Sequence, residues 1–557
     1  MIKTQSTTKW LLGKIKKRIP ALMFLTLCSI GTSFFGVMFS LGTKRVIDSA
    51  VGGDREVFLR ACALQALIIV AILICSILAR FLREKIHVEL DRDWKKTMIH
   101  SLLNGEYKSV SAFHSGELIN RLNNDVRIVD DGLVNIVPKI ASMIVKLVFA
   151  FLVLSSLTQW FALALLGAGL IVILVTCLVR RRLKNLHKRV SEATGRVSSI
   201  MQEAMEKLLA VQAMDISAEI ERRVDARLSE RFQLQRKRYR ISVFSNTCIS
   251  VMFYVAGFIT LVFCSNGLLT GTMTFGTMTA VTQLVNQIQN PFVGLSGIIP
   301  QYISTSASVE RLYELDCLPK SLTPLEEPAE NIYRRMEHIT AQDLVFTYDR
   351  DKILDNAEFS LSKGSFCVIS GPSGIGKSTL LKLLLGIYTP DKGSLYFQCG
   401  DEQITIDGST RHLFSYVPQG NLLFSGTIKE NLLVIKPDAT DEEINHAVYI
   451  SGMDLYLPQL PNGLDTQLGE SGAGLSEGQV QRLAIARAIL SGAPVLLLDE
   501  CTSALDANTE ALVLQRLRNQ SNKTCVAVTH RPIADEICDT VIRMDAGKVR
   551  VCALNEC

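Results

Sequence analysis

The sequence predicts a helical membrane domain of six spans, followed by a soluble α/β domain that contains a phosphate-binding loop. Long uncharged stretches all lie before Glu310, and a glycine-rich loop joins an apolar run to a helical run further along the chain. The length of 557 residues also exceeds what one hydrophobic core usually supports. A mean hydropathy of +0.25 with 20% charged residues indicates an average over two unlike halves. This composition excludes a disordered chain and a disulfide-stapled one.

Residues 1–18 are expected to form an interfacial elbow helix that leads into the first span. Trp10, Leu11 and Ile15 supply apolar side chains among several lysines. A helix of this composition lies along the membrane surface, because its apolar side chains enter the lipid while its charged ones stay in water. A full-length apolar span follows directly, so the segment does not read as a cleavable signal.

The transmembrane domain is expected over residues 19–318. Its uncharged stretches cover residues 19–43, 61–79, 147–179 and 241–309. A helix needs about 20 apolar residues to cross the hydrocarbon layer, so each stretch holds at least one span. The third stretch turns at residues 155–160, with its first helix beginning near Pro138, and the fourth is interrupted around residues 265–271. The expected count is therefore six helices.

Two long charged loops set the orientation of the chain. Residues 80–137 and 180–240 are rich in Lys and Arg, whereas the turns between the other spans carry little or no charge. Basic loops stay on the cytoplasmic side, which places both termini, both loops and the soluble domain in the cytoplasm. We therefore expect a multi-pass protein of a bacterial cytoplasmic membrane, in contact with membrane lipids. The net charge of +5 follows from this loop bias and indicates no nucleic-acid partner.

A polar linker is expected over residues 319–336, where Pro319, Pro324 and Pro328 recur among charged and hydroxyl side chains. Proline interrupts regular structure, so this composition is typical of a connection between domains. The soluble nucleotide-binding domain is then expected over residues 337–557.

A phosphate-binding loop is the clearest motif of the soluble domain. Residues 366–370 predict a short buried strand, and a mostly apolar helix begins directly after the loop. The motif G-x-x-x-x-G-K-[ST] in this context surrounds phosphate oxygens with backbone N–H groups. Lys377 is expected to neutralise the β- and γ-phosphates of ATP, and Ser378 to bind Mg²⁺. The predicted cofactor-binding residues here are Gly371, Pro372, Ser373, Gly374, Ile375, Gly376, Lys377, Ser378 and Thr379.

Two further strands are expected to end at the same site. An apolar run ends at Asp499 and Glu500, and the run 524–529 ends before His530. The carboxyl ends of parallel strands meet at one edge of an α/β sheet. We expect Asp499 to hold Mg²⁺ through water, Glu500 to act as general base and His530 to contact the γ-phosphate. Lys377, Glu500 and His530 are thus the predicted catalytic residues.

A short polar segment, Leu475 to Gln479, precedes another helical run. At this segment the chain resembles the ATP-binding cassette (ABC) transporter family, and the likeness covers essentially the whole sequence. The fusion of six spans to one cassette is similar to the half-transporters of the exporter branch. Further motifs carry the resemblance, which implies an adenine-stacking aromatic, a Q-loop glutamine near the metal, a signature segment and a D-loop. The residues in these places are Tyr348, Gln419, Ser476, Gly478, Gln479 and Asp506, and the implied metal set is Ser378, Gln419 and Asp499.

The resemblance also implies how the chain works. Two cassettes face head to tail, so that each ATP lies between Lys377 of one chain and Ser476 and Gly478 of the other. Segments 109–115 and 207–214 resemble coupling helices that pass cassette closure to the spans. The implied activity is ATP hydrolysis that drives export of an amphipathic drug, lipid or peptide by alternating access. A homodimer of half-transporters is the favoured assembly.

Glu477 departs from the family pattern, which usually has a glycine in its place. A carboxylate here repels a γ-phosphate if it turns toward the nucleotide, and is favourable at a helix N-terminus if it turns away. The first case would suit a heterodimer with one degenerate ATP site, and the second a competent homodimer. An ATP-gated channel or regulator on the same scaffold would need a lost catalytic residue or an added domain, and neither is visible.

Polar residues in the last span are candidates for substrate contact. Gln283, Asn286, Gln287 and Asn290 share one helical face. They would either line a transport pathway or bond one helix to another. Lys146, within the third span, is either a cavity charge for an anionic substrate or a side chain that reaches the membrane surface.

Overall fold

The computed structural model divides into two compact units. The first comprises Met1–Leu102 and His114–Cys317, and the second Leu103–Phe113 and Leu318–Cys557. The segment 103–113 therefore belongs to the second unit, although it follows a long helix of the first. The structure describes residues 2–321, 325, 327–348, 351–420, 423–469, 474–520, 522–529, 537–545 and 547–553.

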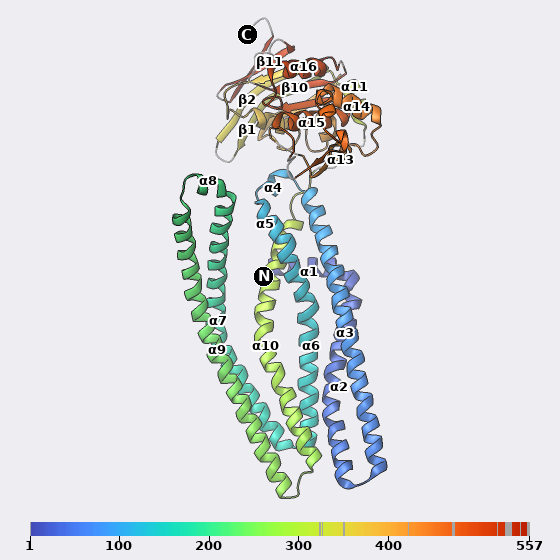
Figure 1. The fold of residues 1–557 in the computed structure, drawn as a ribbon, viewed down its shortest axis with the longest axis vertical. Helices are drawn as coiled ribbons and strands as arrows, with labels where there is room; N and C mark the ends of the chain where they lie inside the picture. Colours follow the sequence, from blue (N-terminus) through green and yellow to red (C-terminus); the bar gives the residue numbers. More distant parts are fainter. Residues whose placement is uncertain are drawn as a thin grey trace. The chain divides into compact units, whose positions relative to one another are not determined.

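The described part of the first unit is built from helices (Figure 1). Helices α6 and α10 pack against each other and against α2, while α7 pairs with α9 and the short α8 joins those two at one end. The elements are α1 (Ile2–Ile15), η1 (Lys16–Arg18), α2 (Ile19–Gly52), α3 (Arg55–Leu103), α5 (Ser115–Asn120), the π-helical turn η2 (Arg121–Asp125), α6 (Val126–Leu157), α7 (Gln159–Glu206), α8 (Leu208–Ala213), α9 (Ser217–Leu269) and α10 (Phe275–Asp316).

The long helices end near the predicted turns. Thr158, between α6 and α7, has an extended backbone with φ −155° and ψ 91°. Residues 270–274 separate α9 from α10. Among the described residues, four helical segments are long and apolar enough to cross a membrane: Ser6–Gly52, Arg55–Leu103, Ser115–Leu157 and Ser217–Leu269. The other two predicted spans fall on α7 and α10.

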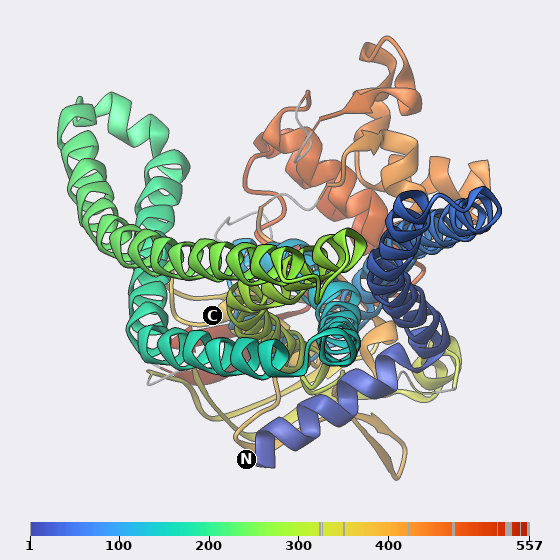
Figure 2. The ribbon, with the colours of Figure 1, turned by 90° about the horizontal axis from the view of Figure 1, so that it is seen from below.

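Helix α1 lies crosswise to α2, which suits an interfacial elbow (Figures 1 and 2). Its Trp10 ring contacts Trp94 and Tyr313, at centroid distances of 5.4 and 5.5 Å. The Trp10 indole Nε1 donates to Asp316 Oδ2 at 2.7 Å, and Lys14 pairs with the same oxygen at 2.9 Å. Because an indole is both apolar and a donor, it fixes α1 to the last turn of α10.

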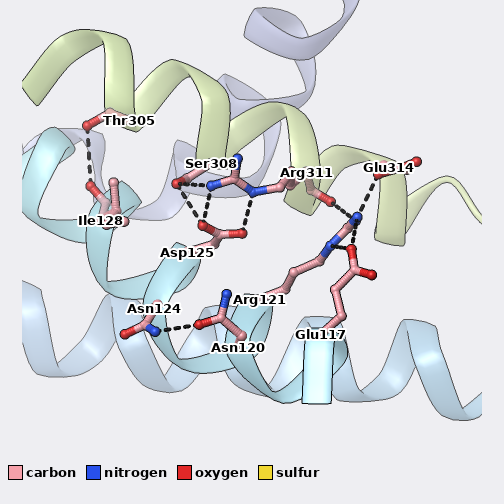
Figure 3. Close-up of polar contacts among 10 residues, drawn as sticks. All are labelled: Glu117, Asn120, Arg121, Asn124, Asp125, Ile128, Thr305, Ser308, Arg311 and Glu314. Atoms are coloured by element: carbon pink, nitrogen blue, oxygen red, sulfur yellow. Dashed lines mark hydrogen bonds and ion pairs between the residues drawn. The ribbon is translucent and has the colours of Figure 1, made fainter. Parts of the chain in front are cut away.

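A cluster of ionic contacts joins η2 to α10 (Figure 3). Asp125 accepts hydrogen bonds from Ser308 Oγ at 2.9 Å and from two nitrogens of Arg311 at 2.7 and 2.6 Å. Arg121 donates to Glu117 at 2.6 Å and to Glu314 at 2.8 Å. Arg121 and Asp125 are the first and last residues of the π-helical turn, and the side chains of both reach α10. We call these six residues the η2–α10 cluster.

The second unit contains an antiparallel sheet of order β2-β1-β4-β5 and a mainly parallel sheet of order β12-β11-β3-β10-β9-β6. In the parallel sheet only β12 runs opposite to its neighbour. The described strands are β1 (His338–Tyr348), β2 (Asp351–Ser362), β3 (Phe366–Ser370), β4 (Lys392–Cys399), β5 (Glu402–Thr405), β6 (Phe414–Val417), β7 (Gly426–Thr427), β8 (Gln467–Leu468), β9 (Val495–Asp499), β10 (Thr524–Val528), β11 (Thr540–Asp545) and β12 (Lys548–Ala553).

Both faces of the parallel sheet are covered, which explains its continuous apolar strands. In β10, Val526 and Val528 join one core cluster, while Cys525 and Ala527 join the cluster on the other face. Successive side chains of a strand point to opposite faces, so a sheet buried on both sides needs an apolar residue at every position. The covering helices are α12 (Lys377–Leu384), α13 (Ile428–Leu433), α14 (Asp441–Ile450), α15 (Glu477–Leu490) and α16 (Ala507–Arg518).

Part of the predicted linker packs into the second unit. Helix α11 (Ala329–Arg335) buries Ile332 fully in the core beside β1. Further back, Glu106 N donates to Pro319 O at 2.7 Å and Ser321 N donates to Asn104 O at 2.9 Å, next to the short helix α4 (Tyr107–Ser111). The predicted domain boundaries at residues 18, 318 and 336 stay predictions.

Candidate nucleotide site

The phosphate-binding loop runs from β3 into α12, as the motif predicts. Gly376 has φ 108°, and a Cβ at this position would collide with the side chain of Ile353 on β2, so only glycine fits. Lys377 Nζ donates to the carbonyl oxygens of Gly371 and Pro372, at 2.8 and 3.0 Å. These bonds hold the ammonium inside the curve of the loop, where it can meet a phosphate. Ser373, Gly374 and Ile375 complete the loop, and Ser378 and Thr379 lie in the first turn of α12.

Asp499, the last residue of β9, meets Ser378 across the sheet edge. Ser378 Oγ donates to Asp499 Oδ1 at 3.0 Å, and the Tyr416 hydroxyl donates to Oδ2 at 3.0 Å. Burial raises the pKa of the Asp499 carboxyl, and these two hydrogen bonds oppose the shift by stabilising the charged form. A hydroxyl beside a buried carboxylate offers the hard oxygen ligands that Mg²⁺ prefers, so the residues present fit the predicted ion.

Glu500 follows directly and has a left-handed backbone, with φ 48°. Such a conformation is costly for a residue with a side chain, and clusters at functional sites. The Gln419 Nε2 donates to Glu500 Oε2 at 2.7 Å. Glu500 and Gln419 therefore contact each other, although the sequence predicts separate roles for them, as general base and as Q-loop glutamine.

The signature segment lies at the N-terminus of α15. Ser476 is the residue before the helix, and its backbone N donates to the side-chain oxygen of Gln479 at 2.7 Å. Gln479 therefore caps the helix within its own chain. A Cβ on Gly478 would lie 2.9 Å from the carbonyl oxygen of Ala504 in the D-loop (residues 503–506), so the close approach of the D-loop requires glycine. Glu477 is exposed in the first turn, where a negative charge is favourable.

The D-loop is held against α15 by a residue that the motif analysis did not select. Gln481 donates from Nε2 to Ser503 Oγ at 3.0 Å and accepts from Ala504 N at 3.1 Å. Asp506 is the N-cap residue before α16, and its side chain accepts a hydrogen bond from Thr509 N at 3.0 Å. Sequence reasoning also missed Tyr416, because its contact with Asp499 depends on β6 lying beside β9, and no local pattern reveals strand order.

The remaining predicted site residues are Tyr348 and His530. Tyr348 ends β1, with 53% of its surface exposed, so that its ring can meet a base. His530 lies outside the described residues, one position after Thr529.

One residue of the polar stripe of α10, Gln287, makes contacts between helices. Gln287 Nε2 donates to Gly36 O at 2.9 Å and to Ser40 Oγ at 3.0 Å, both on α2. This geometry favours the interhelical reading for Gln287. The Oε1 atoms of Gln283 and Gln287 are buried without a partner in the described structure. Asn290 has a side chain outside the described part, and Lys146 is half-buried on α6.

Family models match both parts of the chain. A model of the ABC transporter transmembrane region matches residues 22–292, and a model of the ABC transporter cassette matches residues 354–503. The second match includes the phosphate-binding loop, Gln419, the signature segment, Asp499 and Glu500. Tyr348, Asp506 and His530 lie outside it.

Relatives and a solved structure extend the likeness. A probable ABC transporter ATP-binding/permease protein of Haemophilus influenzae is 29% identical over 443 residues, 78% of this chain and 79% of the relative. The mycobactin import ATP-binding/permease protein IrtB of Mycobacterium tuberculosis is 35% identical over 285 residues, 50% of this chain and 49% of the relative. The structure of a bacterial Atm1-family ABC exporter with ATP bound matches with a TM-score of 0.82 and 22% identity, covering 97% of this chain and 96% of that one.

These findings confirm the predicted fold class, a helical membrane domain followed by an α/β cassette. They also confirm that the chain is a multi-pass membrane protein that binds ATP. The chain belongs to the ABC transporter family, as a half-transporter in which a membrane domain is fused to an ATPase domain coupled to transport.

Proposed function

We propose that the chain exports an amphipathic substrate, driven by MgATP hydrolysed at the site described above. One observation carries the proposal: Ser378, Gln419, Asp499 and Glu500 come from three separate segments and meet at one sheet edge, in a chain that also carries the membrane helices. A transport ATPase needs both parts, because closing two cassettes around ATP must do work on the membrane domain.

Each residue of the site has a proposed role. Lys377 binds the β- and γ-phosphates, while Ser378, Asp499 and Gln419 hold Mg²⁺, which when bound offsets phosphate charge. Glu500 accepts the proton of the attacking water, and its hydrogen bond from Gln419 orients the carboxylate. His530 contacts the γ-phosphate, and Tyr348 stacks on adenine. The loop residues from Gly371 to Thr379 surround the phosphates.

The proposed partner is a second copy of the chain. Ser476 and Glu477 are exposed in the single chain at the N-terminus of α15, where the helix dipole favours an anion. A second cassette, placed head to tail, would bring its ATP to Ser476 and Gly478, and Asp506 would lie at the same interface. The sequence-derived alternative, a heterodimer with one degenerate site, depends on Glu477 turning toward that ATP.

The direction and the cargo belong to the same proposal. The fold matches that of an Atm1-family exporter, whereas the relative IrtB is a mycobactin importer, so both directions occur on this scaffold. We favour export of a drug, lipid or peptide with an apolar part, because such a molecule partitions into the bilayer and reaches the membrane helices from there. The proposed location is a bacterial cytoplasmic membrane, with the cassette and both termini in the cytoplasm.

A transport assay with matched variants tests the proposal. The purified chain is reconstituted in vesicles, and vanadate-sensitive ATPase activity is measured beside a Glu500→Gln control. Accumulation of fluorescent amphipathic dyes and short-chain fluorescent phospholipids is then followed in inside-out and right-side-out vesicles. Export predicts ATP-dependent accumulation in inside-out vesicles by the active chain only. Accumulation in right-side-out vesicles alone would show import, and an inactive single chain that a second half-transporter revives would show a heterodimer.

A further inference from the structure

Three tyrosine rings form a continuous path in the second unit. Tyr388 lies between Tyr348 and Tyr107, with edge-to-face ring contacts at centroid distances of 6.0 and 6.3 Å. Phe346 stacks on Tyr388 at 5.4 Å. We call Tyr348, Tyr388 and Tyr107 the tyrosine path. It runs from the end of β1 to the first residue of α4.

The middle ring of the tyrosine path is buried and the two outer rings are exposed, an arrangement that could carry a constraint from one end of the path to the other. Tyr388 is 7% exposed, whereas Tyr348 and Tyr107 are 53% and 49% exposed. The buried ring is confined by the core, so it cannot turn away when a neighbour shifts, while the outer rings are free to meet other groups. The phenol of Tyr388 is neutral at physiological pH, as in an ordinary tyrosine, and burial raises its pKa further, to about 12.

One end of the tyrosine path lies near the phosphate-binding loop, and the other lies where the chain enters the cassette. Tyr348 is on the hairpin whose second strand carries Ile353 against the phosphate-binding loop. Tyr107 follows Glu106, which is hydrogen-bonded to Pro319, where the chain enters the cassette from α10. One end therefore belongs to the nucleotide site, and the other to the segment that connects the cassette to the helices α3 and α10.

We propose that Tyr388 is a positioning residue that couples base binding at Tyr348 to the α4 segment through Tyr107. This inference rests on the proposed adenine-stacking role of Tyr348. When a base stacks on Tyr348, the orientation of the Tyr348 ring is fixed. Because the ring of Tyr388 is confined by the core, this restriction also limits the orientations available to Tyr107. Coupling between two sites is reciprocal. If bound ATP strengthens the contact of Tyr107 by some factor, that contact must strengthen ATP binding by the same factor, so a change at Tyr107 must alter the affinity for ATP.

The size of the effect follows from the contacts. An edge-to-face aromatic pair contributes a factor of about two to ten to an equilibrium. Tyr388→Leu should therefore raise the KM for ATP about two- to tenfold with little change in kcat, and Tyr388→Phe, which keeps the ring, should raise the KM less. Tyr107→Leu should raise the KM about two- to fivefold, although Tyr107 is not expected to touch ATP.

The test is a double-mutant cycle on the full-length chain in lipid nanodiscs, with the KM and kcat for ATP and GTP as readouts. Tyr107→Leu should raise the KM in the wild-type background and have no further effect beside Tyr348→Ala. Tyr449→Leu, an exposed tyrosine of α14, is the matched control and should leave the KM unchanged.

The outcomes separate the two proposals. If Tyr348→Ala raises the KM for ATP but Tyr107→Leu does not, or if the two changes are independent, the tyrosine path is refuted and the adenine role stands. If Tyr348→Ala leaves the KM unchanged, both fail. Should Tyr388→Leu not fold, the cycle between the two exposed tyrosines still decides the question.

Discussion

The η2–α10 cluster leads to an asymmetric prediction about one ion pair. The Asp125 side chain is 3% exposed and that of Arg311 is 45% exposed, although they share two hydrogen bonds. Figure 3 shows Ser308 as the other hydrogen-bond donor to Asp125. Arg311→Ala would therefore leave a buried carboxylate with the hydroxyl of Ser308 as the donor that remains among the residues drawn. Stranding a buried charge costs about 3–5 kcal/mol.

The reverse change should cost much less. Asp125→Asn removes the buried charge, and the half-exposed guanidinium of Arg311 can be hydrated, so the loss is about 1–2 kcal/mol. The difference of about 2–3 kcal/mol is roughly a 30- to 150-fold difference in the population of the locally opened state. The double variant should resemble Asp125→Asn alone, because no buried charge remains.

Hydrogen exchange of the amides in residues 115–130 measures the population of the locally opened state directly, since the free energy of local opening sets their exchange rates. A global melting temperature is less suitable, because a chain of two units need not unfold in one step. Arg222→Ala, which breaks an exposed pair with Glu219, is the control and should change exchange little. Equal acceleration by Arg311→Ala and Asp125→Asn would refute the reasoning, as would a neutral Arg311→Ala.

Three further predictions concern the cassette. Glu500→Gln should lower kcat for ATP about 10²–10⁴-fold while ATP binding persists, because only the proton acceptor is lost; unchanged turnover would exclude the general-base role. Tyr416→Phe removes a hydrogen bond that holds the Asp499 carboxylate in place, so half-maximal activity should need more Mg²⁺, by up to about tenfold, as a titration would show. Gly478→Ala should lower ATPase activity, because its methyl group meets the Ala504 carbonyl, and wild-type activity would show that the D-loop can move away.

Contiguous residues determined the local parts of the site. The phosphate-binding loop works through nine consecutive residues that lead from a strand into the first turn of a helix, so its function can be predicted without knowing the rest of the fold. The uncharged stretches similarly predicted the membrane helices, since the length of an apolar run must match the bilayer. The turn at Thr158 was also predictable, because the run of apolar residues is interrupted there by polar ones.

Tertiary structure alone decided which distant side chains meet. Tyr416 and Asp499 are 83 positions apart, and Gln419 and Glu500 are 81 apart, so their contacts depend on β6 lying next to β9. The same holds for the tyrosine path, which needs segment 103–113 to join the cassette rather than the helices that flank it. Sequence by itself determined the chemistry of each strand end and the membrane helices. Only folding decided the partners of those groups, because strand order and helix packing depend on long-range burial that no local pattern encodes.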